Sequence, residues 1–111
     1  MQVRNFYTGS VIYECSDCAT MRDLVERAVK EGVSLAGANL TRANLTRANL
    51  SGANLVGAKL TGVDLYEADL SGSDLTGANL IKAYLTGTNL TGANLTGANL
   101  SDANIADAEN Y

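Results

Sequence analysis

Two cysteines, Cys15 and Cys18, form the one motif of this 111-residue chain that is typical of a chemical site. A Cys-x-x-Cys pair can take part in thiol–disulfide exchange or supply two thiolates to a zinc ion. Zinc sites need about four ligands, whereas the chain has two cysteines and no histidine. A redox pair would suit the start of a helix, close to Cys18, although the βαβ pattern of thioredoxin-like folds is missing.

The structural alternative is that the cysteines are small apolar residues where a strand meets a helix. From the sequence, a reduced, a bridged and a metal-bound pair all stay open. Other catalytic groups are scarce, because histidine, the commonest acid–base catalyst, is absent. No glycine-rich phosphate loop is present either. We therefore predict a protein that is not an enzyme and that has neither a cofactor nor a bound metal.

Charge and hydropathy narrow the range of partners and locations. The 8 basic and 12 acidic residues leave a net charge of −4, which exerts no general attraction on nucleic acid or anionic lipid. No run approaches the roughly 18 apolar residues of a membrane span. The segment Met1–Asn5 also lacks the basic-then-apolar pattern of a signal peptide. We expect a cytoplasmic protein that binds neither nucleic acid nor a membrane.

The fold of most of the chain is indicated by a leucine at every fifth position between Leu35 and Leu100, a spacing that Ile105 continues. In an α-helix this spacing would spread the leucines over all sides, and in a strand they would point alternately to opposite faces. A chain that turns a corner once in five residues brings them all to one axis. The pattern predicts an all-β solenoid, in which each unit buries its leucine by stacking on the previous coil.

Each five-residue unit has a characteristic residue at each place. Two places before the leucine the residue is small, usually alanine, which suits an inward position in a narrow coil. Directly before the leucine stands Asn or Asp in most units, and these side chains stabilise turns. Nine of the 11 glycines occupy the second place after a leucine, as expected for a corner.

Residues 1–32 lack the repeat and are predicted to form a separate N-terminal domain. Two short strands, about Gln2–Tyr7 and Val11–Cys15, would make a β-hairpin that turns at Thr8 and Gly9.

A helix is predicted to follow the hairpin. Thr20 is its expected N-cap, Asp23 completes a weak capping box, and Gly32 lies just past its end. Residues at helical spacing form one apolar stripe, which comprises Met21, Leu24, Val25, Ala28 and Val29. Because a solenoid end exposes unpaired backbone and the rim of its core, we expect the hairpin and the helix to cap the N-terminal end of the stack.

The tandem units Ala-Asn-Leu-Thr-Gly, Ala-Asn-Leu-Ser-Gly and Ala-Asp-Leu-Ser-Gly resemble the pentapeptide repeat family over about residues 33–108. The resemblance implies a right-handed quadrilateral β-helix with four units in each coil, so that the repeat domain, residues 33–109, would make about four coils. Members occur widely in bacteria and phages, which suggests such an origin for this chain. Most have no known activity, and a minority bind DNA gyrase by imitating duplex DNA.

Departures from the repeat gather on two adjacent sides when the units are arranged in coils of 20 residues. These sides are centred on the series that begin at Leu40 and Leu45. Arginine and aromatic residues are favoured at protein interfaces, although outward residues can also drift freely between repeat copies. The candidate partner-contact face comprises Arg42, Arg47, Lys59, Tyr66, Glu67, Ile81, Lys82 and Tyr84.

We predict a non-enzymatic structural or protein-interaction module whose partner is unidentified. The alternative is a DNA-mimic modulator of DNA gyrase or another topoisomerase, and a thiol-redox role for the Cys-x-x-Cys motif is third. Duplex DNA carries about one negative charge per 1.7 Å, so a mimic ~18 Å tall should display roughly ten. The repeats instead contain seven acidic and four basic residues. A gyrase supercoiling assay with and without the protein separates the first two hypotheses.

The C-terminal end bears on the oligomeric state. The last unit runs into residues 108–111 without a capping helix. The rim of the core would then be lined by Leu90, Leu95, Leu100 and Ile105. Either two molecules meet there as an end-to-end homodimer, or the tail covers the rim of a monomer with Tyr111, and light scattering would distinguish the two states.

Overall fold

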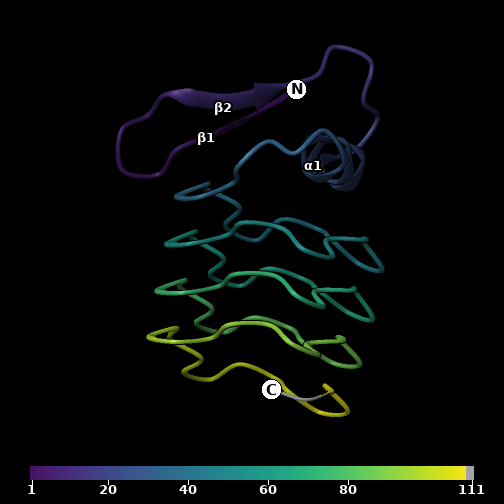
Figure 1. Ribbon diagram of the computed structural model, residues 1–111, viewed down its shortest axis with the longest axis vertical. Helices are drawn as coiled ribbons and strands as arrows, with labels where there is room; N and C mark the ends of the chain where they lie inside the picture. The colour runs from purple at the N-terminus through teal and green to yellow at the C-terminus, as the bar shows by residue number, and fades with distance from the viewer. Residues whose placement is uncertain (110–111) are drawn as a thin grey trace.

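A stack of coils follows an N-terminal hairpin and helix in the computed structural model of the protein, which describes residues 1–109 (Figure 1). The named elements are strand β1, Gln2–Arg4, strand β2, Val11–Glu14, and helix α1, Met21–Lys30. All three precede the repeats. Within the described part of the chain, no helix has the length and apolar character that a membrane span requires.

The repeats stack through parallel backbone bridges between residues 20 positions apart. In one such column, Asn44 pairs with Asp64, Asp64 with Tyr84, and Tyr84 with Asn104. The N–H of Asp64 donates to the preceding coil at 2.9 Å, and the N–H of Leu65 donates to the following coil at 2.8 Å. Because each bridge involves single residues, the ladder consists of short extended segments separated by corners.

The leucines of the repeats form the core of the stack. Every unit leucine from Leu35 to Leu90 is at most 2% exposed. Two polar residues stand where most units have alanine, and both are buried: Ser73 and Thr88 donate their hydroxyls to backbone carbonyls at 2.7 and 2.6 Å. Since each hydroxyl is hydrogen-bonded, these side chains avoid the cost of an unpaired polar group in an apolar core.

Asn and Asp stabilise the corners through local hydrogen bonds. The Oδ1 atom of Asn44, for example, accepts from the backbone N–H of Thr46 at 3.1 Å, two residues later. The residue after Thr46, Arg47, adopts the left-handed conformation, and the repeat glycines at the same place in other units have φ between +64° and +72°. The recurring Asn or Asp before the leucine is therefore explained by the turn that it closes.

Asp74 provides a test of this corner chemistry. The hydroxyl and N–H of Thr76 donate to its Oδ1 at 2.5 and 3.0 Å, and they hold the pKa of the carboxyl below its usual 3.8. The ionised form therefore stabilises the fold above the unfolded-state pKa, and this stabilisation is lost as pH falls through the folded-state pKa. We expect Asp74→Asn, which keeps the acceptor, to lose less thermal stability than wild type below about pH 4. Circular dichroism melts would contradict this if the variant were the more acid-sensitive protein.

The hairpin strands are shorter than the sequence predicts. Strand β1 ends at Arg4 instead of Tyr7, and β2 ends one residue before Cys15. The register of the two strands is irregular between Val3 and Arg4. Asn5 still donates its N–H to the carbonyl of Ser10 at 2.8 Å, but it also forms an antiparallel bridge with Ala38, and its Oδ1 accepts from the N–H of Tyr7 at 2.8 Å. Asn5 thereby connects the hairpin turn to the first coil.

Helix α1 begins where the sequence predicts. The hydroxyl of its N-cap, Thr20, accepts from the N–H of Asp23 at 3.1 Å. Its residues Leu24, Val25 and Ala28 are fully buried in the same hydrophobic cluster as the leucines of the stack. The helix thus contributes directly to the core.

Polar bonds also join the N-terminal elements to the open backbone edge of the first coil. The N–H of Asn39 donates to the carbonyl of Arg4 in β1 at 2.8 Å. The N–H of Asn49 donates to the carboxylate of Glu26 in α1 at 2.7 Å. In the inner coils the equivalent N–H groups donate to the preceding coil, so the hairpin and the helix replace acceptors that a further coil would supply.

We expect Glu26→Ala to lower the free energy of unfolding by about 0.5–1.5 kcal/mol, because the exposed N–H of Asn49 exchanges its carboxylate acceptor for water. Glu26→Gln keeps an acceptor oxygen and should restore most of this loss. Arg22→Ala is the matched control, since it removes only an exposed ion pair to Glu26 at 3.6 Å, which contributes little. Urea unfolding at pH 7 measures all three variants, and equal losses for the Ala and Gln substitutions would contradict the bond's role.

The C-terminal coil is less covered than the others. Leu95, Leu100 and Ile105 are half-buried. Leu90, which the sequence places on the open rim, is only 1% exposed, because Glu109 extends the ladder over it and accepts its N–H at 3.0 Å. The candidate lid residue Tyr111 lies outside the described residues.

Candidate interaction surface

One side of the stack carries charged residues along both of its edges. This side, called the charged side, consists of residues 42–47, 62–67, 82–87 and 102–107, which the bridges stack in one column. Its first edge comprises Arg42, Gly62, Lys82 and Asp102, and its second edge comprises Arg47, Glu67, Gly87 and Asp107.

The charged corner residues have an uncommon backbone conformation. Among the described residues, six other than glycine have positive φ, between 53° and 60°, and all six are the charged residues of the two edges. The repeat corners outside the two edges are glycine, with φ between +64° and +72°. The left-handed conformation costs a residue with a Cβ roughly 1–2 kcal/mol, and local strain of this kind gathers at functional sites. The two edges are therefore the strongest structural indication of a binding surface.

The glycines within these edges make room for their charged neighbours. A Cβ placed on Gly62 would lie 3.3 Å from Cγ of Arg42, and one on Gly87 would lie 3.1 Å from Cγ of Glu67. The long side chains of one coil therefore lie along the edge and over the glycine of the following coil.

Arg47 is the centre of a small polar cluster on the charged side. Its Nε lies 2.9 Å from Oε1 of Glu67, and its guanidinium lies 5.9 Å from the centre of the Tyr66 ring. The hydrogen bond to the Glu67 carboxylate raises the pKa of Arg47 above its usual value. Since both charged side chains are well exposed, the pair orients them more than it stabilises the fold.

The structure places the eight predicted contact residues on two sides. Arg42, Arg47, Tyr66, Glu67, Lys82 and Tyr84 belong to the charged side and are all exposed, with Tyr66 39% and Tyr84 56% accessible. Lys59 and Ile81 lie on the adjacent side and are half-buried.

Two aromatic residues of the hairpin turn are not among the contact residues that the sequence predicts. Phe6 and Tyr7 are exposed and contact each other edge to face, with ring centres 5.1 Å apart. The ammonium of Lys59 lies 4.1 Å from the centre of the Phe6 ring, and the Tyr7 hydroxyl donates to the carbonyl of Gly57 at 2.9 Å. Lys59 therefore makes a cation–π contact within the protein, and no pattern in the sequence connects these distant residues.

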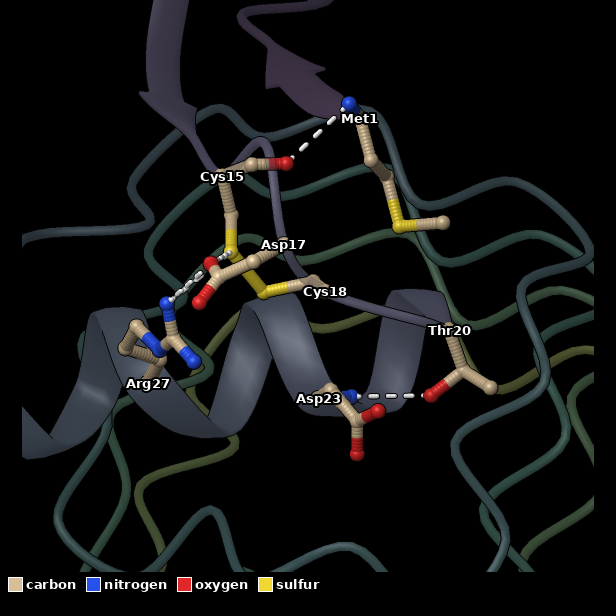
Figure 2. Close-up of a disulfide and its surroundings, with 7 residues drawn as sticks. All are labelled: Met1, Cys15, Asp17, Cys18, Thr20, Asp23 and Arg27. Carbon is tan, nitrogen blue, oxygen red and sulfur yellow. Dashed lines mark hydrogen bonds and ion pairs between the residues drawn. A yellow bond between two sulfur atoms is a disulfide. The ribbon is translucent and has the colours of Figure 1, made fainter.

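The two cysteines are joined in a disulfide between the end of β2 and the start of α1 (Figure 2). This is one of the three states that the sequence leaves open. Cys15 is 5% exposed and belongs to the hydrophobic cluster, as the structural alternative expects. Cys15, Asp17 and Cys18 bring three potential ligand atoms within 4.8 Å of one another. In the bridged state, however, neither sulfur is a thiolate, which is the form that binds metal.

Arg27 connects α1 to the disulfide loop (Figure 2). Its Nη1 donates to Oδ1 of Asp17 at 2.8 Å and lies 3.1 Å from Sγ of Cys15. The hydrogen bond and charge of Arg27 lower the pKa of Asp17, and Asp17 in turn raises the pKa of Arg27. The N-terminal ammonium of Met1 donates to the carbonyl of Cys15 at 3.1 Å. These contacts join β1, β2 and α1 into one unit.

Stacked five-residue units with buried leucines and turning corners define a solenoid repeat protein. Residues 31–65 and 68–107 match the family model of pentapeptide repeats in 8 copies. The chain belongs to the pentapeptide repeat family, as the sequence resemblance predicts. Proteins of this family fold as right-handed quadrilateral β-helices and are generally non-enzymatic structural or interaction modules.

Solved structures of cyanobacterial and plant proteins resemble the chain. A pentapeptide repeat protein from the cyanobacterium Cyanothece 51142 is 41% identical, with a TM-score of 0.52, over 66% of this chain and 53% of that protein. One from the thylakoid lumen of Arabidopsis thaliana is 39% identical, with a TM-score of 0.47, over 69% and 61% of the two chains. The chain thus spans about half the length of the Cyanothece protein. A search of curated proteins finds no significant match.

Proposed function

We propose that the protein is a non-enzymatic interaction module that binds a protein partner through the charged side. The observation that carries this proposal is the set of six charged residues in left-handed conformation along its two edges. A scaffold without a partner would be more stable with glycine at these corners. Exposed Tyr66 and Tyr84 between the edges add the aromatic area that interfaces favour.

We further propose that residues 33–109 form about four right-handed coils and that residues 1–32 serve as their N-terminal cap. The buried stripe of α1 and the hydrogen bonds that the first coil donates to the Arg4 carbonyl and the Glu26 carboxylate support this role. A capped end leaves the sides of the stack as its main binding surfaces.

Affinity capture from the native host tests the function, with variants that restore the residue of other repeat units. Tyr66→Thr with Tyr84→Asn alters the charged side and introduces residues that the same places hold elsewhere. Val56→Thr with Asp74→Asn is the matched control on another side. We expect the control to retain a protein partner that the charged-side variant loses, whereas capture of the same proteins by both would refute the proposal.

A topoisomerase-directed DNA mimic is less well supported. Basic and acidic residues occur together on the edges, where Arg42 and Lys82 share one edge with Asp102, whereas a mimic of duplex DNA should present negative charge throughout. We expect no effect of the protein at micromolar concentration in a gyrase supercoiling assay, and inhibition or protection of the enzyme would favour the mimic instead.

Location and end-to-end assembly stay predictions. A monomer and an end-to-end homodimer through the last coil stay alternatives, with Leu95, Leu100 and Ile105 half-buried at that end. Disulfides persist mainly in oxidising compartments, so the bond between Cys15 and Cys18 weighs against the cytoplasmic location that the sequence suggests.

A further inference from the structure

The charges on the charged side follow an order along the stack. At the N-terminal end, Arg42 and Arg47 make both edges positive, and at the C-terminal end Asp102 and Asp107 make both edges negative. Between them, each edge has one charged residue and one glycine: Glu67 with Gly87 on the second edge, and Lys82 with Gly62 on the first. The charged side therefore has a positive and a negative end.

We propose that the partner of the charged side is a second copy of this chain, packed side by side with its stack antiparallel. This inference rests on the proposed function, because it names the partner of the same surface. A two-fold axis across the middle of the charged side would keep each edge opposite the same edge of the other copy and would reverse the order of the coils. Self-complementary surfaces of this kind are the usual basis of two-fold dimers.

This arrangement matches charge with charge along both edges. Arg42 faces Asp102 of the second copy, and Arg47 faces Asp107 of the second copy. Glu67 and Lys82 each face a glycine of the second copy, so that no like charges oppose each other on the edges and the long side chains have space. Opposite charges across an interface fix its orientation and exclude alternatives.

The centre of the charged side is complementary in the same arrangement. Asp64 and Tyr84 occupy the place before the leucine in the second and third coils of this column, so the two-fold axis brings the tyrosine hydroxyl of one copy opposite the carboxylate of the other. Tyr66 comes opposite Thr86 in the same way. A phenol donates to a carboxylate, and exposed tyrosines near the centre of a contact are favoured anchors.

A parallel side-by-side dimer is excluded by the same charges. A two-fold axis along the stack would place the first edge opposite the second edge within each coil. Arg42 would then face Arg47, and Asp102 would face Asp107, which repel each other. Only the antiparallel arrangement pairs unlike charges at both ends.

The contact is small, and the dimer is correspondingly weak. Coils about 4.8 Å apart and a shortest molecular extent of 21 Å limit the buried area to on the order of 400 Å² per copy. This is about half the area of a standard interface, so we expect a dissociation constant on the order of 100 μM. Because the pairs at the ends are exposed, the association should weaken as salt rises.

Sedimentation equilibrium of the full chain with charge-reversed variants tests the proposal. Arg42→Asp with Arg47→Asp makes all four end corners acidic, and Asp102→Arg with Asp107→Arg makes them all basic; both residue types already occupy these left-handed corners. We expect each variant alone to associate at least tenfold more weakly than wild type and their equimolar mixture to recover the wild-type affinity. A mixture no tighter than the separate variants, or wild type that stays monomeric up to about 1 mM, well above the expected dissociation constant, would overturn the proposal.

Two controls separate this result from other causes. Asp69→Arg with Asp74→Arg has the same net charge as the basic variant but leaves the four end corners of the charged side unchanged, so it should self-associate as tightly as wild type, and a loss of self-association like that of the basic variant would overturn the proposal. An end-to-end dimer would be indifferent to the charge-reversed corners, and that outcome also overturns it. If self-association fails the test while the affinity capture still separates the tyrosine variant from its control, the second copy is rejected and the proposed interaction function stands.

Discussion

Leu70→Ala is expected to lower the free energy of unfolding by about 2–5 kcal/mol. Leu70 is 0% exposed and lies near the middle of the stack. The substitution removes apolar contacts on all sides and leaves a cavity, which the coils above and below can close only by bending their hydrogen-bonded ladder. Urea denaturation followed by circular dichroism measures the loss.

Leu100→Ala is the matched control for this prediction. Leu100 occupies the same place in its unit but is half-buried in the last coil, so its truncation removes fewer contacts and leaves no enclosed cavity. We expect a loss of about 1 kcal/mol. A melting temperature unchanged by Leu70→Ala would refute the inward position of the leucines, and equal losses at both sites would show that burial within the stack does not set the cost.

The repeat could be predicted from the sequence because one residue type, leucine, occupies one environment, the buried core. Leucine at every fifth position has a single solution in which all leucines are buried, and Leu35 to Leu90 are indeed at most 2% exposed. The start of α1 could also be predicted, since Thr20 and Asp23 lie three residues apart and form a local hydrogen bond. Local chemistry and strict periodicity are the two signals that a single sequence carries well.

The connections between the N-terminal elements and the stack could not be predicted in this way. The bond from Asn49 to Glu26 and the contact of Lys59 with Phe6 join residues far apart in the chain. Their side chains are of types that are usually exposed and unremarkable at such places. Only the folded backbone brings them together, because the path of the chain from the hairpin to the first coil decides which side chains meet.

The sequence predicts the candidate surface only in part, because the fold decides which exposed residues lie together. Its residues were found as departures from the repeat, and the stacking places six of the eight on one side. The role of Asp102 and Asp107 was missed, because acidic residues at exposed places carry little information by themselves. Their significance comes from the left-handed backbone that they share with Arg42 and Arg47, which identifies the corners as a set with an ordered arrangement of charge.

Gly37→Ala is expected to be the second most damaging substitution, with a loss of about 2–3 kcal/mol, because two separate costs combine at this corner. Gly37 has φ +70°, where any Cβ is strained. The added Cβ would also lie 2.5 Å from Nδ2 and 3.2 Å from Cγ of Asn5. Asn5 cannot withdraw freely, since its Oδ1 accepts from the N–H groups of Tyr7 and Thr8 at 2.8 and 3.0 Å and so closes the hairpin turn.

Gly72→Ala separates the two costs. Gly72 has φ +67°, and a Cβ there meets nothing within 4 Å, so this variant should lose only the roughly 1 kcal/mol of backbone strain. A double-mutant cycle isolates the clash, because Asn5→Ala removes it and should reduce the cost of Gly37→Ala to that of Gly72→Ala. Thermal and urea unfolding of the four proteins measure the coupling. If Gly37→Ala and Gly72→Ala were equally destabilising, Asn5 would yield to the added methyl group without cost, and the proposed clash at this corner would be refuted.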